Sequence, residues 1–345
     1  MKKHLYIIAG ILLATTGLIV YLNQHSTTNQ PIIMSGTTMG TSYHIKLIPE
    51  AGEKIDVAKL KNQIDTRLAE IDHKMSTYKK DSELSRFNRH PSNQWMEIST
   101  ETFRVIEQAQ EISRLSDGAF DITVGNLVNL WGFGPSINID MIPDSNAIKQ
   151  LQQQIGYQQL QLQKTPTALK KNTDEIYLDL CAIAKGYAVD AIALLILSNN
   201  IDNFLVEIGG EIITHGLKAQ QQPWIVGIES AVAKQRSICK QINLVGSAMA
   251  TSGDYRNYFE QNGSRYSHTI DPRTGRPITH QLASVSVISD SCMQADALAT
   301  ALMVLGPIKG MEFANQHQLA IFMLIKQGDK FIEKQSSSFS TYIKQ

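Results

Sequence analysis

Cysteine is scarce in this chain. Its 345 residues include only Cys181, Cys239 and Cys292, and no two of them form a CxxC pair. No pair of histidines at zinc-ligand spacing lies beside them, which argues against a structural zinc site. An odd set of widely separated cysteines also gives no disulfide framework.

Net charge is absent as well. Lys plus Arg and Asp plus Glu both number 32, so the formal charge is +0 at pH 7. Binding to nucleic acid phosphates needs a basic excess, so nucleic acid is not expected as the main partner. The sequence also lacks GxGxxG after a strand, a Walker loop, GxSxG and HExxH. The signatures of dinucleotide folds, P-loop enzymes, serine hydrolases and zinc proteases are therefore missing.

The clearest feature that is present is an uncharged run near the N-terminus. Lys2 and Lys3 precede the run from Leu5 to Leu22, whose length is near the ~20 residues that a helix needs to cross a bilayer. The lysines should stay on the cytoplasmic side, with the rest of the chain outside. We therefore predict an inner-membrane anchor and polar tether in residues 1–30, and a catalytic domain in residues 31–345 on the periplasmic side.

Two other interpretations of this run stay open. A cleaved signal peptide has a similar composition. However, the small residues at Ala14 to Gly17 come early for a cleavage site, and no clear site follows Leu22. No cysteine near the end of the run could carry a lipid. A buried core helix is the other alternative. The terminal position of the run, its flanking lysines and the polar segment from Asn23 to Gln30 argue against it.

The rest of the chain mixes helical and strand patterns. Helical spacing of apolar residues, together with caps, predicts helices at residues 60–71, 100–115, 144–156, 183–197 and 293–305. Strands are expected at 42–48, 176–180, 204–208, 224–228, 284–288 and 319–325, with an Asn262-Gly263 turn between residues 258–259 and 265–266. Because strands and helices do not alternate regularly, we predict an α+β fold.

Asp296 and Thr300 stand four residues apart on a predicted helix and so share one face. Carboxylate and hydroxyl oxygens together suit a hard cation such as Mg²⁺ or Ca²⁺. A solvated aspartate beside a core-facing threonine has the same spacing and is the commoner arrangement. The pair is therefore a candidate cation site only in combination with other features.

Two further segments suit an anionic ligand. The segment from Asp179 to Tyr187 places Lys185 in the first turns of an apolar helix, whose N-terminus favours phosphate. A lysine there meets a ligand or an acid, or else extends along the surface to reach solvent. The turn from His268 to Pro277 carries one histidine and two arginines. Such a rigid loop could serve a phosphate, although plain turns have the same composition.

A set of ordered segments gives these candidates more weight. They are Gly36–Thr41, Met75–Tyr78, Asp81–Asn88, Ser116–Thr123, Leu130–Gly134, Leu178–Tyr187, Val206–Glu211, Ala250–Tyr255, His268–Pro277 and Ala295–Thr300. Together they resemble the FAD:protein FMN transferase family, the ApbE family, over about residues 34 to 325. Two features depart from the family pattern. No lipoprotein cysteine follows the N-terminal run, and Cys181 stands where glycine or serine is common.

The resemblance implies an α+β fold with mixed sheets and helices around a central FAD-binding cleft. By position in the motifs, the implied FAD contacts are Met39, Tyr78, Ala119, Phe120, Asp121, Asp179, Lys185 and Ile270. The implied Mg²⁺ ligands are the backbone carbonyl of Ala182 and the side chains of Asp296 and Thr300. This set agrees with the oxygen-ligand pair identified from spacing.

The activity that the resemblance implies is Mg²⁺-dependent transfer of FMN from FAD to a Ser or Thr hydroxyl of a partner protein, with AMP leaving. Typical acceptors resemble membrane subunits of redox complexes. A threonine hydroxyl needs a proton acceptor, and His268 is the best-placed candidate because it lies in a matching motif near Ile270. Two alternatives stay open: an FAD pyrophosphatase that releases free FMN and AMP, and an envelope flavin-binding protein without turnover.

Overall fold

The structure is a computed structural model that describes residues 30–50, 52–135, 142–231, 237–254, 258–261, 264–328 and 330–343. The predicted membrane helix and the Asn262-Gly263 turn lie outside the described residues. Within them, one helix, α8 (Cys292–Gln316), is long and apolar enough to cross a membrane by length and composition. More than half of its apolar stretch is buried inside the protein, as in a core helix.

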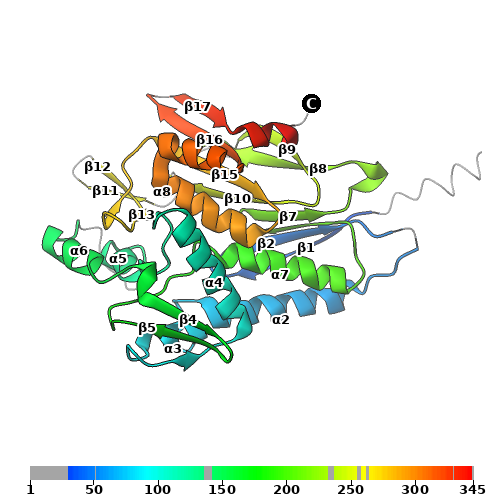
Figure 1. The fold of residues 1–345 in the computed structure, drawn as a ribbon. Coiled ribbons are helices and arrows are strands. Elements are labelled where there is room, and N and C mark those ends of the chain that lie inside the picture. The colour runs from blue at the N-terminus through cyan, green and yellow to red at the C-terminus, as the bar shows by residue number, and fades with distance from the viewer. Residues whose placement is uncertain are drawn as a thin grey trace, which may run out of the picture.

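An antiparallel sheet of eight strands runs through the molecule, in the order β1-β2-β6-β7-β10-β15-β16-β17 (Figure 1). Its strands are β1 (Ile32–Thr38), β2 (Thr41–Leu47), β6 (Phe204–Ile208), β7 (Glu211–His215), β10 (Ala248–Gly253), β15 (Leu282–Ser289), β16 (Ala320–Gln327) and β17 (Lys330–Gln335). The predicted strands at 42–48, 204–208, 284–288 and 319–325 are confirmed within two residues at each end.

The two faces of the sheet are covered differently. Along β16, Ile321 and Met323 belong to the larger core, whereas Phe322 and Leu324 belong to a smaller one, as the two-residue repeat of a strand requires. The helices α2 (Val57–Met75), α4 (Thr100–Leu115), α7 (Ala184–Ser198) and α8 build the larger core. The smaller core lies under β8 (Trp224–Glu229), β9 (Ile238–Leu244) and η3 (Ser337–Tyr342).

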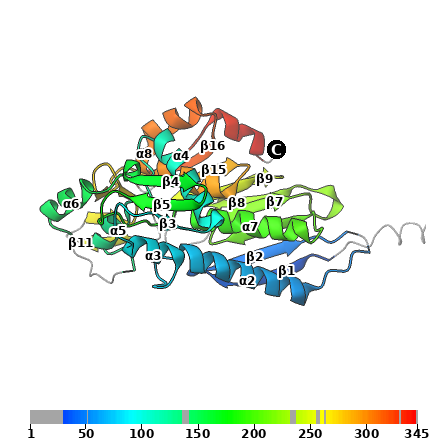
Figure 2. The ribbon, with the colours of Figure 1, turned by 60° about the horizontal axis from the view of Figure 1, so that its bottom comes forward.

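Smaller elements complete the fold. A second sheet, β3-β5-β4, lies with α3 on the helix side of the molecule, away from β8 and β9 (Figures 1 and 2). These elements are α3 (Glu83–Arg89), β3 (Met96–Glu97), β4 (Leu160–Lys164) and β5 (Thr167–Lys171). The others are α5 (Gly125–Leu130), α6 (Ser145–Gln152), η1 (Tyr157–Gln159), η2 (Ala219–Gln221), β11 (Tyr258–Gln261), β12 (Ser264–Ser267), β13 (Ile270–Asp271) and β14 (Arg276–Pro277).

The predicted helices form where apolar spacing and caps agree. Leu60, Ile64, Leu68 and Ile71 are all buried on α2. The predicted N-cap Asp144 accepts hydrogen bonds from the backbone N–H groups of residues 146 and 147, although α6 ends four residues before Gly156. The predicted hairpin at 258–266 is confirmed by the antiparallel pairing of β11 with β12.

One prediction of secondary structure was wrong. Residues 176–180 form no strand beyond a single bridge between Val124 and Tyr177, because their backbone groups bond to a loop and to a side chain instead of a neighbouring strand. The last predicted helix is confirmed up to a kink at Gly306. This glycine breaks the helical geometry with a φ of 77°, and Pro307 follows it, but helical turns then continue to Gln316.

Candidate active site

A cleft of about 420 Å³ lies between the N-terminal part of α7, the middle of α8, the β6–β7 turn and the loop before β13. Residues from distant parts of the sequence line it. They include every predicted site residue except Met39, namely Tyr78, Ala119, Phe120, Asp121, Asp179, Ala182, Lys185, His268, Ile270, Asp296 and Thr300. The fold thus brings the predicted set together, while the role of each residue stays a prediction.

Met39 lies in the β1–β2 turn, where its φ is 48°, and packs against the larger core. Thr41, which begins β2 directly after this turn, lies beside the cleft wall. A Cβ atom on Gly209 in the cleft wall would lie 2.9 Å from Cγ2 of Thr41. The contact of Met39 with FAD stays a prediction.

The floor of the cleft contains one lysine between two acids. Nζ of Lys185 lies 3.3 Å from Oε1 of Glu211 and 3.9 Å from Oδ2 of Asp296. It also donates to the carbonyl of Cys181 at 3.3 Å. The sequence left open whether Lys185 meets a ligand or an acid, and in the structure it meets acids.

Burial and charge shift the pKa values of these three groups. Burial raises the pKa of the Asp296 carboxyl, and the nearby Lys185 ammonium opposes that rise. Burial also raises the pKa of Glu211 to about 8, again against the effect of Lys185. For Lys185, burial favours a lower pKa, but the carboxylates of Asp296 and Glu211 outweigh it and raise the pKa. The Lys185 ammonium therefore opposes the effect of burial on both acids without cancelling it.

The predicted cation ligands suit Mg²⁺ chemically. Oδ2 of Asp296 accepts from the Gly186 N–H at 3.0 Å, and among the described residues nothing donates to Oδ1. Thr300 and Ala182 line the same cleft. The described residues contain no group of three or more His, Cys, Asp or Glu side chains that could hold a metal. One carboxylate, one hydroxyl and one carbonyl form a set that leaves the remaining positions to water and phosphate oxygens, which is the usual way proteins bind Mg²⁺.

The relative position of α7 and α8 is fixed at two points. A Cβ atom on Gly186 would collide with the Cys292 carbonyl and lie 2.8 Å from Cα of Met293. One turn along α7, the half-buried carboxylate of Asp190 accepts from Ser291 Oγ at 2.8 Å and from the N–H groups of Cys292 and Met293 at 2.8 and 3.0 Å. These contacts set how far Asp296 stands from the start of α7.

We therefore expect Gly186→Ala to destabilise the protein. The added methyl meets backbone atoms that cannot rotate away, and such overpacking costs about 1–3 kcal/mol. Urea unfolding should show this loss in the free energy of unfolding. Ser198→Ala, at the exposed end of the same helix, is the control and should have little effect. An unchanged stability of Gly186→Ala would refute the close approach of the two helices.

A buried polar frame holds Asp179 at the cleft. Oδ1 of Asn88 accepts from the Leu178 N–H at 2.7 Å, and Nδ2 donates to the Leu178 carbonyl at 2.9 Å. Nζ of the fully buried Lys171 donates to the carbonyls of Asn88 and Ile176 at 2.8 and 3.2 Å. Neither Asn88 nor Lys171 is a site residue that the sequence predicts. Asn88 ends the Asp81–Asn88 segment, which is a usable signal, whereas nothing in the sequence marks Lys171.

Asp121 lines the cleft with a carboxylate that already has partners. Its Oδ1 accepts from the N–H and hydroxyl of Thr123 at 2.8 and 2.7 Å, and its Oδ2 accepts from the Tyr157 N–H at 2.8 Å. Burial raises its pKa, and these hydrogen bonds oppose the rise. Asp121 therefore ties the loop after α4 to the start of η1, whatever its contact with FAD.

His268 lies on another wall of the cleft, edge-on to Phe133 with ring centroids 6.3 Å apart. The Asp271 carboxylate, which could have oriented this histidine, accepts from Nε and Nη2 of Arg273 at 2.9 Å. The carbonyl of Asp271 also accepts from the backbone N–H groups of the turn. Arg276 donates to Ser145 Oγ at 3.0 Å. Both arginines thus bind residues outside the cleft lining. These contacts do not support the hypothesis that the arginines bind a phosphate in the cleft.

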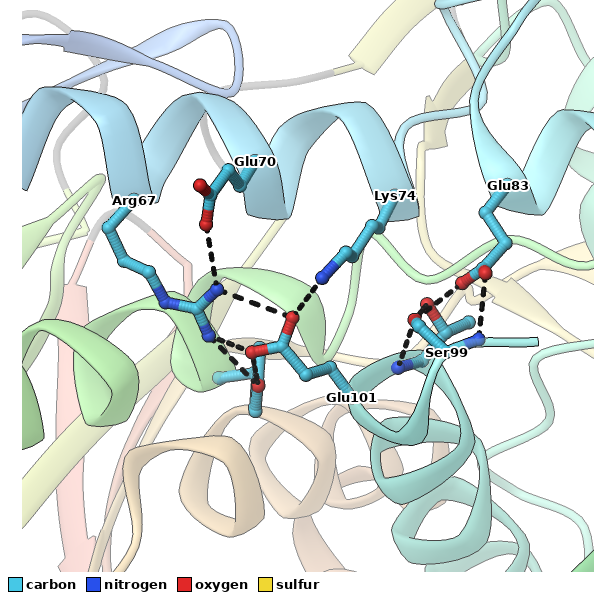
Figure 3. A network of polar contacts seen from close by, with 8 residues as sticks. Arg67, Glu70, Lys74, Glu83, Ser99 and Glu101 are labelled. Atoms are coloured by element: carbon cyan, nitrogen blue, oxygen red, sulfur yellow. Dashed lines mark hydrogen bonds and ion pairs between the residues drawn. The ribbon is translucent and has the colours of Figure 1, made fainter. Parts of the chain in front are cut away.

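Helix α7 is also tied to α2 and α4. Tyr187, which ends the motif that carries Lys185, donates from its hydroxyl to Oε1 of Glu101 at 2.9 Å. Glu101 in turn pairs with Arg67 and Lys74 of α2 (Figure 3). The motif therefore combines a residue of the cleft with a residue that anchors the same helix.

Comparison with known proteins gives the same result as the motifs. The model of the ApbE family matches residues 39–323. The chain is 46% identical over 314 residues to the FAD:protein FMN transferase of Vibrio cholerae serotype O1, covering 91% of this chain and 93% of that one. The corresponding protein of Escherichia coli K12 is 39% identical over 313 residues, covering 90% and 89%.

Solved structures agree with the fold. The flavin transferase ApbE from Vibrio cholerae is similar with a TM-score of 0.84 at 45% identity, covering 91% of this chain and 99% of that one. The apo form of Pseudomonas stutzeri flavinyl transferase ApbE has a TM-score of 0.84 at 36% identity, covering 91% and 97%. These similarities confirm the resemblance drawn from the motifs and the mixed α/β fold.

Proposed function

Since this chain belongs to the ApbE family, we propose that it transfers FMN from FAD to a Ser or Thr hydroxyl of a partner protein, with Mg²⁺ required and AMP released. The observation that supports this most is the convergence on one cleft of Asp179, Lys185, Asp296 and His268. A bare flavin-binding site would not need a cation-ligand set and a histidine beside each other.

The reaction forms one bond and breaks another. The acceptor oxygen attacks the phosphorus of the FMN half, and the bond to the bridging oxygen breaks, so that AMP leaves with that electron pair. The acceptor proton passes to His268. Bound Mg²⁺ supplies neutralisation of the phosphate charge.

The chain's own residues then position the substrate. Asp296, Thr300 and the Ala182 carbonyl hold the cation. Asp179 binds polar groups of the flavin or its ribityl chain, from a loop that Asn88 keeps rigid. Lys185 faces the diphosphate. Such alignment of the nucleophile and the leaving group contributes much of the catalysis in phosphoryl transfer.

The product balance tests this function against its alternatives. FAD, Mg²⁺ and the full-length protein are incubated with and without a candidate acceptor, and AMP and free FMN are separated by chromatography. We expect AMP only with the acceptor, and little free FMN. AMP with equal free FMN in the absence of the acceptor would mean a pyrophosphatase. Unchanged FAD in both samples would mean a binding protein.

We also propose that the protein is anchored in an inner membrane with residues beyond about 24 on the periplasmic side, where its acceptor would be a membrane subunit of a redox complex. Lys2 and Lys3 before the uncharged run support this orientation. A reporter that requires export should be active when fused after Gln30, and a reporter active only in the cytoplasm should not. The reverse pattern, or a mature N-terminus beyond Leu22, would contradict the uncleaved anchor.

A further inference from the structure

The Lys185 ammonium contacts three oxygen atoms on the cleft floor. Besides the Cys181 carbonyl, these belong to Glu211 and Asp296, whose side chains are 5% and 8% exposed. The Lys185 side chain is 27% exposed, so its ammonium reaches the cleft. In the free protein, the positive charge beside Asp296 is therefore the Lys185 ammonium.

A metal ion on Asp296 would stand close to this ammonium. Two positive charges at short range in a poorly solvated site repel each other strongly. Asp296 is the only charged side chain in the proposed metal set, so it offers little to offset that repulsion. Metal binding to the free protein is thus opposed by Lys185, unless the ammonium moves.

Glu211 already pairs with the ammonium, because its Oε1 lies 3.3 Å from Nζ of Lys185, nearer than Oδ2 of Asp296 at 3.9 Å. Glu211 begins β7 directly after Gly209 and Gly210, and its Oε2 is buried with no hydrogen-bond partner among the described residues. At Gly209 a Cβ atom would lie 3.3 Å from Cδ of Lys185, so the glycine leaves room for the lysine stem. A small further movement of the ammonium toward Glu211 would also pair Oε2 and would end the contact with Asp296.

Building on the proposed function, we propose that the Lys185 ammonium, shared between Asp296 and Glu211 in the free protein, blocks the cation position beside Asp296. In this proposal Glu211 is the positioning residue that holds the ammonium alone once Mg²⁺ and the diphosphate of FAD are bound. The diphosphate adds negative charge and metal ligands at once, which compensates the ammonium and completes the coordination. Cation and FAD should therefore bind with positive coupling, each tightening the other.

The test is Mn²⁺ binding to the full-length protein, read from the EPR signal of free Mn²⁺ with and without FAD. In the wild type, FAD should tighten Mn²⁺ binding by about 10- to 100-fold. Lys185→Met should bind Mn²⁺ without FAD about 10-fold more tightly than the wild type, because the competing cation is gone. If this variant does not fold, Lys185→Gln serves the same purpose. Lys164→Met, an exposed lysine with 77% of its side chain accessible, is the control and should match the wild type.

Glu211→Gln separates positioning from direct metal binding. With FAD present it should weaken Mn²⁺ binding about 10-fold, because the ammonium returns to Asp296. In the double variant Lys185→Met/Glu211→Gln this loss should vanish, since Glu211 acts only through the lysine. A double variant that binds Mn²⁺ more weakly than Lys185→Met would overturn the proposal, as would a Lys185→Met variant with wild-type affinity. These measurements involve no acceptor or turnover, so they are independent of the transfer assay.

Discussion

Asp296→Asn should abolish FMN transfer at ordinary Mg²⁺ concentrations. Asparagine can still accept the hydrogen bond from Gly186, so the helix contact survives, but the only charge in the proposed metal set is lost. Metal stabilisation of phosphoryl charge contributes several kcal/mol, which corresponds to a rate lower by about 10³-fold. The initial rate of covalent flavin formation on the acceptor measures the effect. Asp296→Ala should be at least as inactive and less stable.

The matched control for this variant is Asp290→Asn, which makes the same change at an exposed position before α8 and should keep wild-type activity. FAD binding by Asp296→Asn should be weakened less than its rate, since the flavin end of FAD is expected at Asp179. Normal transfer by Asp296→Asn with Mg²⁺ unchanged would remove Asp296 from the mechanism.

His268→Ala should slow flavin transfer by about 10²–10⁴-fold, the usual contribution of a general base. Its FAD affinity should stay within a few-fold of the wild type, because the histidine is assigned to the acceptor hydroxyl and not to FAD. If proton removal is the lost step, higher pH should partly restore the rate. Single-turnover rates at saturating FAD, measured over a pH series, give both quantities.

A purely structural role of His268 predicts a different pattern. His268→Gln or His268→Asn would then keep most of the activity, since either side chain can pack against Phe133. His73→Ala, at an exposed position of α2, controls for the loss of a histidine. The base assignment fails if His268→Ala transfers flavin at the wild-type rate, or if it loses FAD binding and rate together.

Local sequence patterns predicted the helices and strands whose buried residues recur at a regular spacing. The apolar spacing of Leu60, Ile64 and Leu68 led to α2, and the cap at Asp144 led to α6. The motif resemblance went further and named residues that now line one cleft. Local pattern failed at residues 176–180, because Asn88, some ninety positions away, satisfies the backbone of Leu178 in place of a sheet.

The contacts that define the floor of the cleft could not be derived from local pattern. Lys185 and Glu211 meet only because β6 and β7 form a hairpin beside the start of α7. Asp190 caps α8 from a position about a hundred residues earlier. Such pairs depend on how the sheet orders its strands, and neither partner carries a local signal of the other. Met39 shows a limit of the motif resemblance. Its motif matches the family, but its side chain packs outside the cleft lining.

The mass of the acceptor tests the central claim most directly. Full-length protein, FAD and Mg²⁺ are incubated with a candidate membrane redox subunit, whose intact mass and peptides are then measured. We predict a mass increase equal to one FMN joined through its phosphate, located on a Ser or Thr, and absent with Asp296→Asn or with a chelator. An acceptor of unchanged mass, while free FMN and AMP accumulate in equal amounts, would contradict the transfer function and favour hydrolysis.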